Sequence, residues 1–243
     1  MASRLDIEKS RLVYTQEIGW IDRNHALGGD ARSLWAQLLT ENTTPYYKDY
    51  FLVSYDQLMG KFFIKMGVTS CWLVKKGLRE EDKKSIALSI MFYISTLFET
   101  HQGRFLFSGL LGSDSGFSGE DLISNLLGFY SVIEPRDYWS LIKPVPTETA
   151  LRIWDHYGPV GKYKNRELRP WIFPDPQESP NGVPFKKNLP HYMNTIQPFN
   201  SYESDIVIKL NVTDGWALMN PLMILVKIIK LRWIHILSYD QMV

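Results

Sequence analysis

The chain has 243 residues, 45% of them hydrophobic, and this length and composition suit one domain with a sizeable core. Its 27 basic and 26 acidic residues leave a formal net charge of +1, so the basic excess of a nucleic-acid-binding protein is missing and we expect no nucleic-acid partner. The single cysteine, Cys71, excludes an intrachain disulfide and a cysteine-rich zinc site, and we expect a buried thiol.

The N-terminal residues carry charges where a signal peptide needs an apolar centre. We therefore expect a cytoplasmic protein, or one that is exported by a route that reads no such signal. The first strong element is a short helix from Asp30, as its cap, through Leu39, and residues 42–45 should end it.

The next segment, residues 50–63, is ambiguous. Residues 50–53 have strand propensity, whereas the apolar residues between Tyr55 and Phe62 are spaced as on a helix. Residues 68–74 are expected to form a short strand, after which Gly77 precedes the acidic start of a helix.

Two amphipathic helices follow and should form the centre of the protein. Apolar residues recur every three or four positions from Lys83 to Gln102, which predicts a helix there. Ser118 has the character of an N-cap, and the apolar residues after it predict a second helix that ends before Pro135.

The C-terminal part has a different composition. Thr147 should cap a short helix that ends near His156, and the closely spaced prolines between Pro170 and Pro198 forbid regular structure and predict a long loop wrapped on the body. Residues 205–212 alternate like a strand. The pattern as a whole predicts a mainly α fold with a few short strands, in which residues 1–160 form a helical core and residues 161–243 pack on the same domain.

An apolar segment with interspersed basic residues, Leu222 to Leu237, lies near the C-terminus. It is too short and too charged for a membrane-spanning helix, which needs about 20 mostly apolar residues. We expect a core element; the alternatives are a segment that binds a protein partner or a membrane surface, and a non-native tail.

Glu99 is the first candidate for chemistry. On the helix that ends at Gln102 it shares a stripe with Leu88, Phe92 and Ser95, so we expect a carboxylate beside apolar surface. Desolvation raises the pKa of a carboxyl group and makes it usable as a general acid. The alternative is a glutamate in the last turn of the helix that reaches solvent or bonds to backbone.

The following helix carries a second polar stripe of Asp121, Asn125 and Gly128. A glycine inside a strong helix costs about 1 kcal/mol relative to alanine, which indicates that another element approaches closely at Gly128. The preceding helix is the nearest candidate in sequence. Asp121 has an alternative role, as the partner of the amides at the start of its helix.

Asp22 and His25 are three residues apart, so the carboxylate can orient the imidazole if the segment forms a helical turn. The alternative is an ordinary turn histidine. A metal site made of His25, Asp22 and Glu99 is a further alternative, although the sequence has no recognised metal, phosphate-loop or dinucleotide motif and we expect no cofactor.

Three blocks of the sequence together resemble an uncharacterised family of bacterial proteins, some of them envelope-associated, for which no activity is established. The blocks are Gly19–Asp22 with His25, Phe98–Glu99 with Gln102, and residues 117–130. The likeness covers residues 15–135. It implies that five polar residues belong together, but it supplies no reaction. These residues are His25, Glu99, Gln102, Asp121 and Asn125.

These residues lead to two functional hypotheses. The first is a bacterial hydrolase acting on glycan or cell-wall material, with Glu99 as general acid or base and Asp22 or Asp121 as the second carboxylate. In this hypothesis, residues that position or stack on the substrate are the following: His25, Gln102, Asn125, Trp20 and Tyr130. The second is a non-catalytic interaction protein or delivered effector that uses Leu222 to Leu237.

Overall fold

A long antiparallel hairpin is the largest sheet element of the protein. In the computed structural model, which describes residues 2–41, 48–61, 64–104, 118–200, 205–210 and 216–218, β3 (Tyr50–Lys61) pairs with β4 (Ile64–Lys75) along the full length of both strands. The other edge of β4 pairs with β7 (Val207–Leu210) and with β8 (Trp216–Leu218). Segments far apart in the sequence therefore complete one antiparallel sheet.

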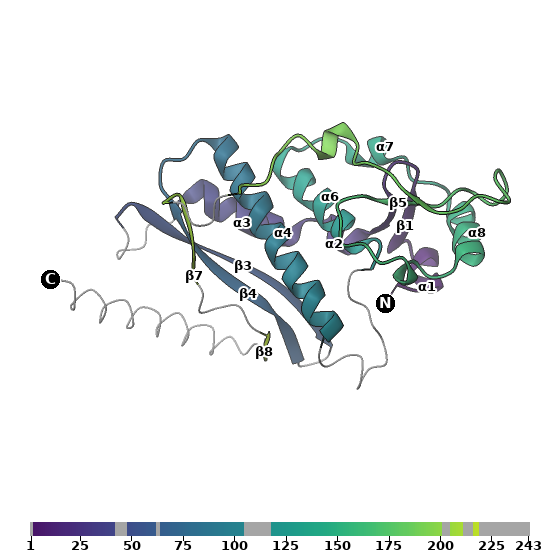
Figure 1. The fold of residues 1–243 in the computed structure, drawn as a ribbon, viewed down its shortest axis with the longest axis horizontal. Helices are drawn as coiled ribbons and strands as arrows, with labels where there is room; N and C mark the ends of the chain where they lie inside the picture. The colour runs from purple at the N-terminus through teal and green to yellow at the C-terminus, as the bar shows by residue number, and fades with distance from the viewer. Residues whose placement is uncertain are drawn as a thin grey trace.

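Helices pack on this hairpin. The helix α4 (Glu80–Arg104) crosses it, and α3 (Gly29–Thr40) contacts β3 and α4 (Figure 1). The helix α6 (Asp121–Ile133) contacts both α3 and α4. The main hydrophobic core lies among these elements and contains the fully buried Trp72 and Phe129.

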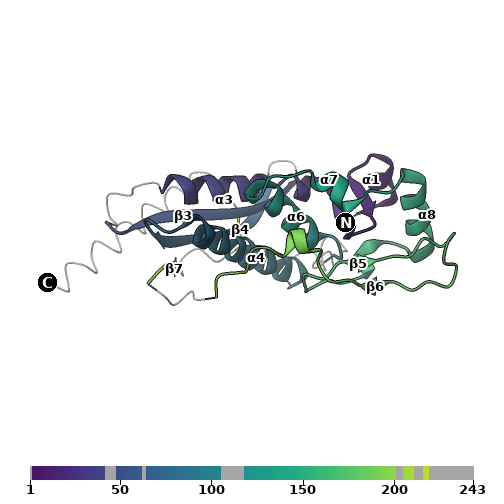
Figure 2. The same cartoon turned by 90° about the horizontal axis from the view of Figure 1, so that it is seen from above.

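A second, smaller core lies around the N-terminal elements. The strands β1 (Leu12–Thr15) and β2 (Gly19–Asp22) pair with each other, and α1 (Arg4–Glu8) contacts α8 (Thr147–Tyr157). Aromatic rings dominate this core, with Trp20 edge-on to Trp154 at 5.7 Å between ring centroids. Seen from above, the molecule is elongated, with the β3–β4 hairpin toward one end and α8 at the other (Figure 2).

The remaining elements are short. They are α2 (Arg23–Ala26), α7 (Tyr138–Ile142), the single-turn helices η1 (Val160–Lys162) and η2 (His191–Met193), and the paired strands β5 (Trp171–Ile172) and β6 (Phe185–Lys186). The proline-rich region is thus mostly irregular. Phe173 and Met193 from this region are buried against the body, as the sequence predicts for a wrapped loop.

The expectation of a mainly α fold is wrong. The protein is mixed, with three antiparallel sheets in the described part of the chain, and β3 and β4 have 12 residues each. The helix-like spacing after Tyr55 belongs to β3. Pairing along the full length of a neighbouring strand overrides a local spacing that also fits a helix.

Three predicted helix caps are also wrong. The N-cap of α8 is Pro146, and Thr147 is the first residue of that helix. The N-cap of α6 is Glu120, and Ser118 lies two residues before it. The N-cap of α3 is Gly28 in the left-handed conformation, with φ of 64°, which places Asp30 in the first turn. Within the described ranges no helix is both long and apolar enough to cross a bilayer. The segment Leu222 to Leu237 lies outside the described residues, so its proposed partners stay predictions.

Candidate functional site

Polar side chains from three helices meet where α2 packs on α6. The strand β2 ends at Asp22, whose carboxylate caps α2 by accepting a hydrogen bond from the Asn24 backbone N–H at 2.7 Å. Figure 1 shows α2 beside α6 in the middle of the molecule. This short helix therefore carries Asp22 and His25 directly onto the polar stripe of α6.

A crossing of two glycines permits this close packing. A Cβ atom at Gly128 would lie 2.6 Å from the backbone oxygen of His25, and one at Gly28 would lie 2.3 Å from the backbone oxygen of Gly128. Neither position tolerates a side chain without movement of the backbone. The prediction that another element approaches Gly128 is confirmed, but that element is the end of α2 and not the preceding helix.

Hydrogen bonds fix the contact between the helices. The backbone N–H of Asp22 donates to Ser124 Oγ at 2.9 Å, and His25 Nδ1 lies 2.9 Å from Asn125 Oδ1. The Asn125 amide nitrogen in turn donates to Ser95 Oγ at 3.4 Å, which ties α6 to α4. Ser124 and Ser95 are both fully buried, so these bonds satisfy polar groups in the interior.

Glu120 is the most unusual titratable group in this region. It is only 4% exposed, and no lysine or arginine in the described part of the chain forms an ion pair with it. Ser118 Oγ donates a hydrogen bond to its carboxyl group. Burial raises the pKa of Glu120, and the nearby charge of Asp22 raises the pKa further, while the Ser118 bond and the charge of His25 act in the opposite direction.

We refer to Asp22, His25, Glu120 and Asn125 as the acidic cluster. Three of its members were predicted from the sequence, and Asp121 lies one helical turn before Asn125 and is half-buried. The backbone of α4 includes residues 99 and 102, but the side chains of Glu99 and Gln102 lie outside the described part of the structure. Their predicted roles therefore stay predictions.

The two aromatic residues predicted to stack on sugars are placed in the core. Trp20 is 3% exposed and Tyr130 is 1% exposed. Trp20 packs edge-on against Tyr14 and Trp154, and the hydroxyl group of Tyr130 accepts a hydrogen bond from the Ile196 backbone N–H at 3.1 Å. Neither ring presents a face to solvent on which a sugar could stack, because both complete the hydrophobic cores instead.

Sequence reasoning missed Glu120 as a functional residue. Taking Ser118 as the N-cap placed Glu120 in an exposed first turn, where an acidic residue is ordinary. One signal was available: Ser124 lies four residues after Glu120, on the same side of a helix that is otherwise strongly apolar. A small polar residue there indicates a polar neighbour in the interior, and Ser124 Oγ does accept a hydrogen bond from the Asp22 backbone N–H at 2.9 Å.

No group of three or more histidine, cysteine, aspartate or glutamate side chains that could hold a metal ion exists among the described residues. The metal alternative from the sequence includes Glu99, whose side chain is outside that set. The acidic cluster as described offers one imidazole and two carboxyl groups, which suit proton transfer.

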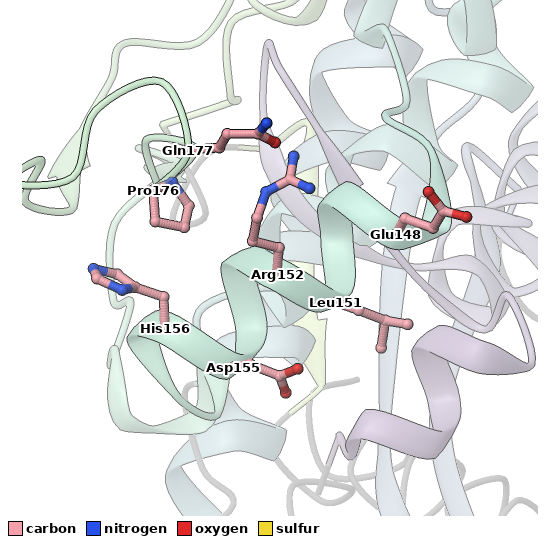
Figure 3. A pocket seen from close by; sticks show the side chains of 7 residues that line it. All are labelled: Glu148, Leu151, Arg152, Asp155, His156, Pro176 and Gln177. Atoms are coloured by element: carbon pink, nitrogen blue, oxygen red, sulfur yellow. The ribbon is translucent and has the colours of Figure 1, made fainter.

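A second feature is an open surface hollow of about 720 Å³ on α8. Most of its lining comes from α8, and Pro176 and Gln177 face the helix from the loop after β5 (Figure 3). Arg152, which lies in this hollow, forms a two-pronged ion pair with Asp175 at 2.8 and 2.6 Å. No residue of the acidic cluster lines the hollow, so the two features are separate.

No known protein family, no curated protein and no solved structure matches this chain. The resemblance to an uncharacterised bacterial family therefore stays a prediction from the sequence.

Proposed function

We propose that the protein is a hydrolase in which the carboxyl group of Glu120 is the general acid and the carboxylate of Asp22 is the second acidic group. The observation that carries this proposal is the burial of Glu120, which no lysine or arginine among the described residues pairs with and whose pKa is affected by the charges of Asp22 and His25. A carboxyl group whose pKa is raised in this way holds its proton closer to neutral pH and can give it to a leaving group.

The different environments of the two carboxyl groups support different roles. Glu120 is buried, whereas Asp22 is half-buried and accepts a hydrogen bond from the Asn24 backbone N–H. Different surroundings of two carboxyl groups are the usual basis for assigning one as the acid and the other as its partner. Glu120 thus takes the role that the sequence assigned to Glu99.

The substrate class follows from the chemistry of two carboxyl groups. Cleavage of a glycosidic bond uses one protonated and one ionised carboxyl group on either side of the bond. We therefore propose glycan or cell-wall material as the substrate, as expected from the sequence. Stacking by Trp20 and Tyr130 gives no support to this proposal because both rings are buried.

The test is turnover of a panel of soluble glycans and of purified peptidoglycan by the full-length chain. We expect Glu120→Gln to lower kcat by about 10²- to 10⁴-fold, the usual contribution of a general acid, and Asp22→Asn to lower it as well. Glu148→Gln, on the exposed surface of α8, is the matched control and should behave as wild type.

The pattern of losses separates the assignments. Glu99→Gln belongs in the same series. If Glu99→Gln lost activity while Glu120→Gln kept full activity, the assignment of Glu99 as general acid would be favoured and the assignment of Glu120 would be overturned. Activity of the wild type should also fall as pH rises through the raised pKa of Glu120, since the acid must be protonated. A wild-type chain that cleaves no glycan in the panel would refute the substrate class.

A further inference from the structure

The ring of His25 is oriented by a group that can only accept a hydrogen bond. Its Nδ1 lies 2.9 Å from Oδ1 of Asn125, and an amide oxygen has no proton to donate. The proton in this hydrogen bond must therefore be on Nδ1. A neutral imidazole has only one N–H, so the Nε2 atom of the same ring carries a lone pair.

The amide of Asn125 is itself held in place. Its nitrogen donates to Ser95 Oγ on α4 at 3.4 Å, which leaves the oxygen turned toward α2 and His25. The backbone of His25 is fixed independently, because the Gly28–Gly128 crossing brings its carbonyl oxygen onto α6. Ring and backbone are thus both positioned by α6.

From this geometry we infer that Asn125 is a positioning residue that keeps His25 in the Nδ1–H tautomer, and that His25 is the general base of the proposed hydrolase, in the role that an ionised carboxyl group has in most glycosidases. The tautomer follows from the hydrogen bond alone, whereas the role as base rests on the proposed function. No hydrogen bond to Nε2 is formed by any described residue, so its lone pair is available.

The proposed step conserves protons. A water molecule gives a proton to His25 Nε2 while its oxygen forms a bond to the substrate, and the bond to the leaving group breaks as that group takes the proton of Glu120. The imidazolium then returns a proton, through solvent, to the Glu120 carboxylate. Asp22, at the N-terminus of the same short helix as His25, and Glu120 are titratable groups whose charges interact at this site.

The tautomer can be measured without any substrate. Nitrogen-15 NMR of the full-length chain labelled at histidine distinguishes a protonated from an unprotonated ring nitrogen, and loss of signals in His25→Gln assigns this histidine among the five. We expect Nδ1 protonated and Nε2 unprotonated in the neutral ring of the wild type. A neutral ring with its proton on Nε2 would overturn the inference.

Variants of Asn125 test the positioning role. Asn125→Ala should shift the ring toward the Nε2–H form, whereas Asn125→Asp, which still presents an oxygen acceptor, should keep the Nδ1–H form. Ser131→Ala removes a hydroxyl that bonds within α6 and to the Ala26 backbone oxygen of α2; it is the control for disturbance of the helix contact by a change other than at Asn125, and it should leave the tautomer unchanged. An unchanged tautomer in Asn125→Ala would refute the role of Asn125.

Turnover separates this inference from the proposed function. If the wild type cleaves a glycan, we expect Asn125→Ala to lower kcat by about 10²-fold or more with little change in KM, and Asn125→Asp to retain more activity. Full activity in Asn125→Ala together with a changed tautomer would exclude His25 as the base. Absence of turnover in the wild type would remove the hydrolase and leave the tautomer to be decided by NMR.

Discussion

Glu41 and Glu120 lie at the ends of helices, and their neighbours shift the pKa values of the two carboxyl groups in opposite directions. Glu41 follows α3, and its carboxylate lies 2.7 Å from Lys83 Nζ and accepts hydrogen bonds from the Gly77 N–H. Burial pushes its pKa up, but the bonds from Lys83 and Gly77 outweigh burial and hold the pKa below its ordinary value. Glu120 precedes α6, has no such cation in the described structure, and has a raised pKa.

The two regions are also held together differently. The Glu41 region depends on an ion pair whose lysine side chain is only 11% exposed. The acidic cluster depends on the close approach of Gly28 and Gly128 and on neutral hydrogen bonds such as that of Asn125. The ion pair of Glu41 stabilises the folded chain at neutral pH, whereas the Glu120 carboxyl group holds its proton to a higher pH than an ordinary glutamate. Three variants test this difference.

The largest expected effect is at Lys83. Lys83→Met removes the charge, keeps most of the apolar stem and leaves Glu41 without its cation, so we expect the free energy of unfolding to fall by about 3 kcal/mol. Lys84→Met is the matched control, because Glu80 and Glu81, its partners, are largely exposed and such pairs contribute less than about 1 kcal/mol. Urea unfolding measures both, and equal small losses would contradict the assigned role of the pair.

A somewhat smaller loss is expected at Gly128. Gly128→Ala would place a methyl group 2.6 Å from the His25 backbone oxygen, and overpacking of this kind costs about 2 kcal/mol. Gly29→Ala, at the first position of α3 with nothing within 4 Å, should be neutral or slightly stabilising. Urea unfolding measures both variants. If Gly128→Ala were as stable as wild type, the crossing would not hold the acidic cluster together.

The smallest effect concerns pH. Because the pKa of Glu120 is raised above 4.5, the folded chain keeps a proton that the unfolded chain releases, and stability is lost as pH rises through this window. Glu120→Gln stays neutral and should lose less stability than wild type over the same rise in pH. Near pH 4.5 and below, the two chains should differ by less than about 1 kcal/mol, since the side chains have similar shape.

The contribution of Glu41 to stability changes with pH in the opposite direction and serves as the internal reference. Its lowered pKa stabilises the folded chain above the ordinary pKa of 4.5, and this contribution is lost as pH falls. Unfolding by urea across a pH series measures both effects. A Glu120→Gln chain with the same dependence on rising pH as wild type would show that Glu120 is already ionised in the folded state.

The helices that face the main core could be predicted from the sequence. The spacing from Lys83 to Gln102 predicts α4, and the structure has it from Glu80 to Arg104. Its apolar residues Ile86, Ile90 and Ile94 are all buried, as the pattern requires. These predictions succeed because a helix that packs on one side has apolar residues every three or four positions, and this spacing is visible in the sequence of the helix alone.

The sheet could not be predicted in the same way. The register of β3 with β4, such as Phe51 opposite Val74, depends on partners outside each segment. The β7 strand was found in approximate position, but its pairing with β4 joins distant parts of the chain and leaves no local signal. The fold class was therefore wrong although several single elements were predicted correctly.

The candidate site was predictable only in part. The resemblance grouped His25 with Asn125, and the structure places these side chains in contact although they lie 100 residues apart. The glycine in α6 indicated a close approach, but only the fold reveals that α2 is the partner. Glu120 was missed because the capping role of a serine was assigned from local pattern, while the actual cap depends on how α6 is packed.

One side chain also bears on the order in which the protein folds. The hydroxyl group of Tyr14 donates to the Phe173 backbone oxygen at 2.8 Å and accepts from the Phe173 N–H at 2.7 Å, across 159 residues of chain. Closing so long a loop is entropically costly and slow. On the ribosome, the N-terminal hairpin is made early but cannot complete its aromatic core until Phe173 has emerged. The two hydrogen bonds of Tyr14 therefore form late in biosynthesis, after most of the chain has been synthesised.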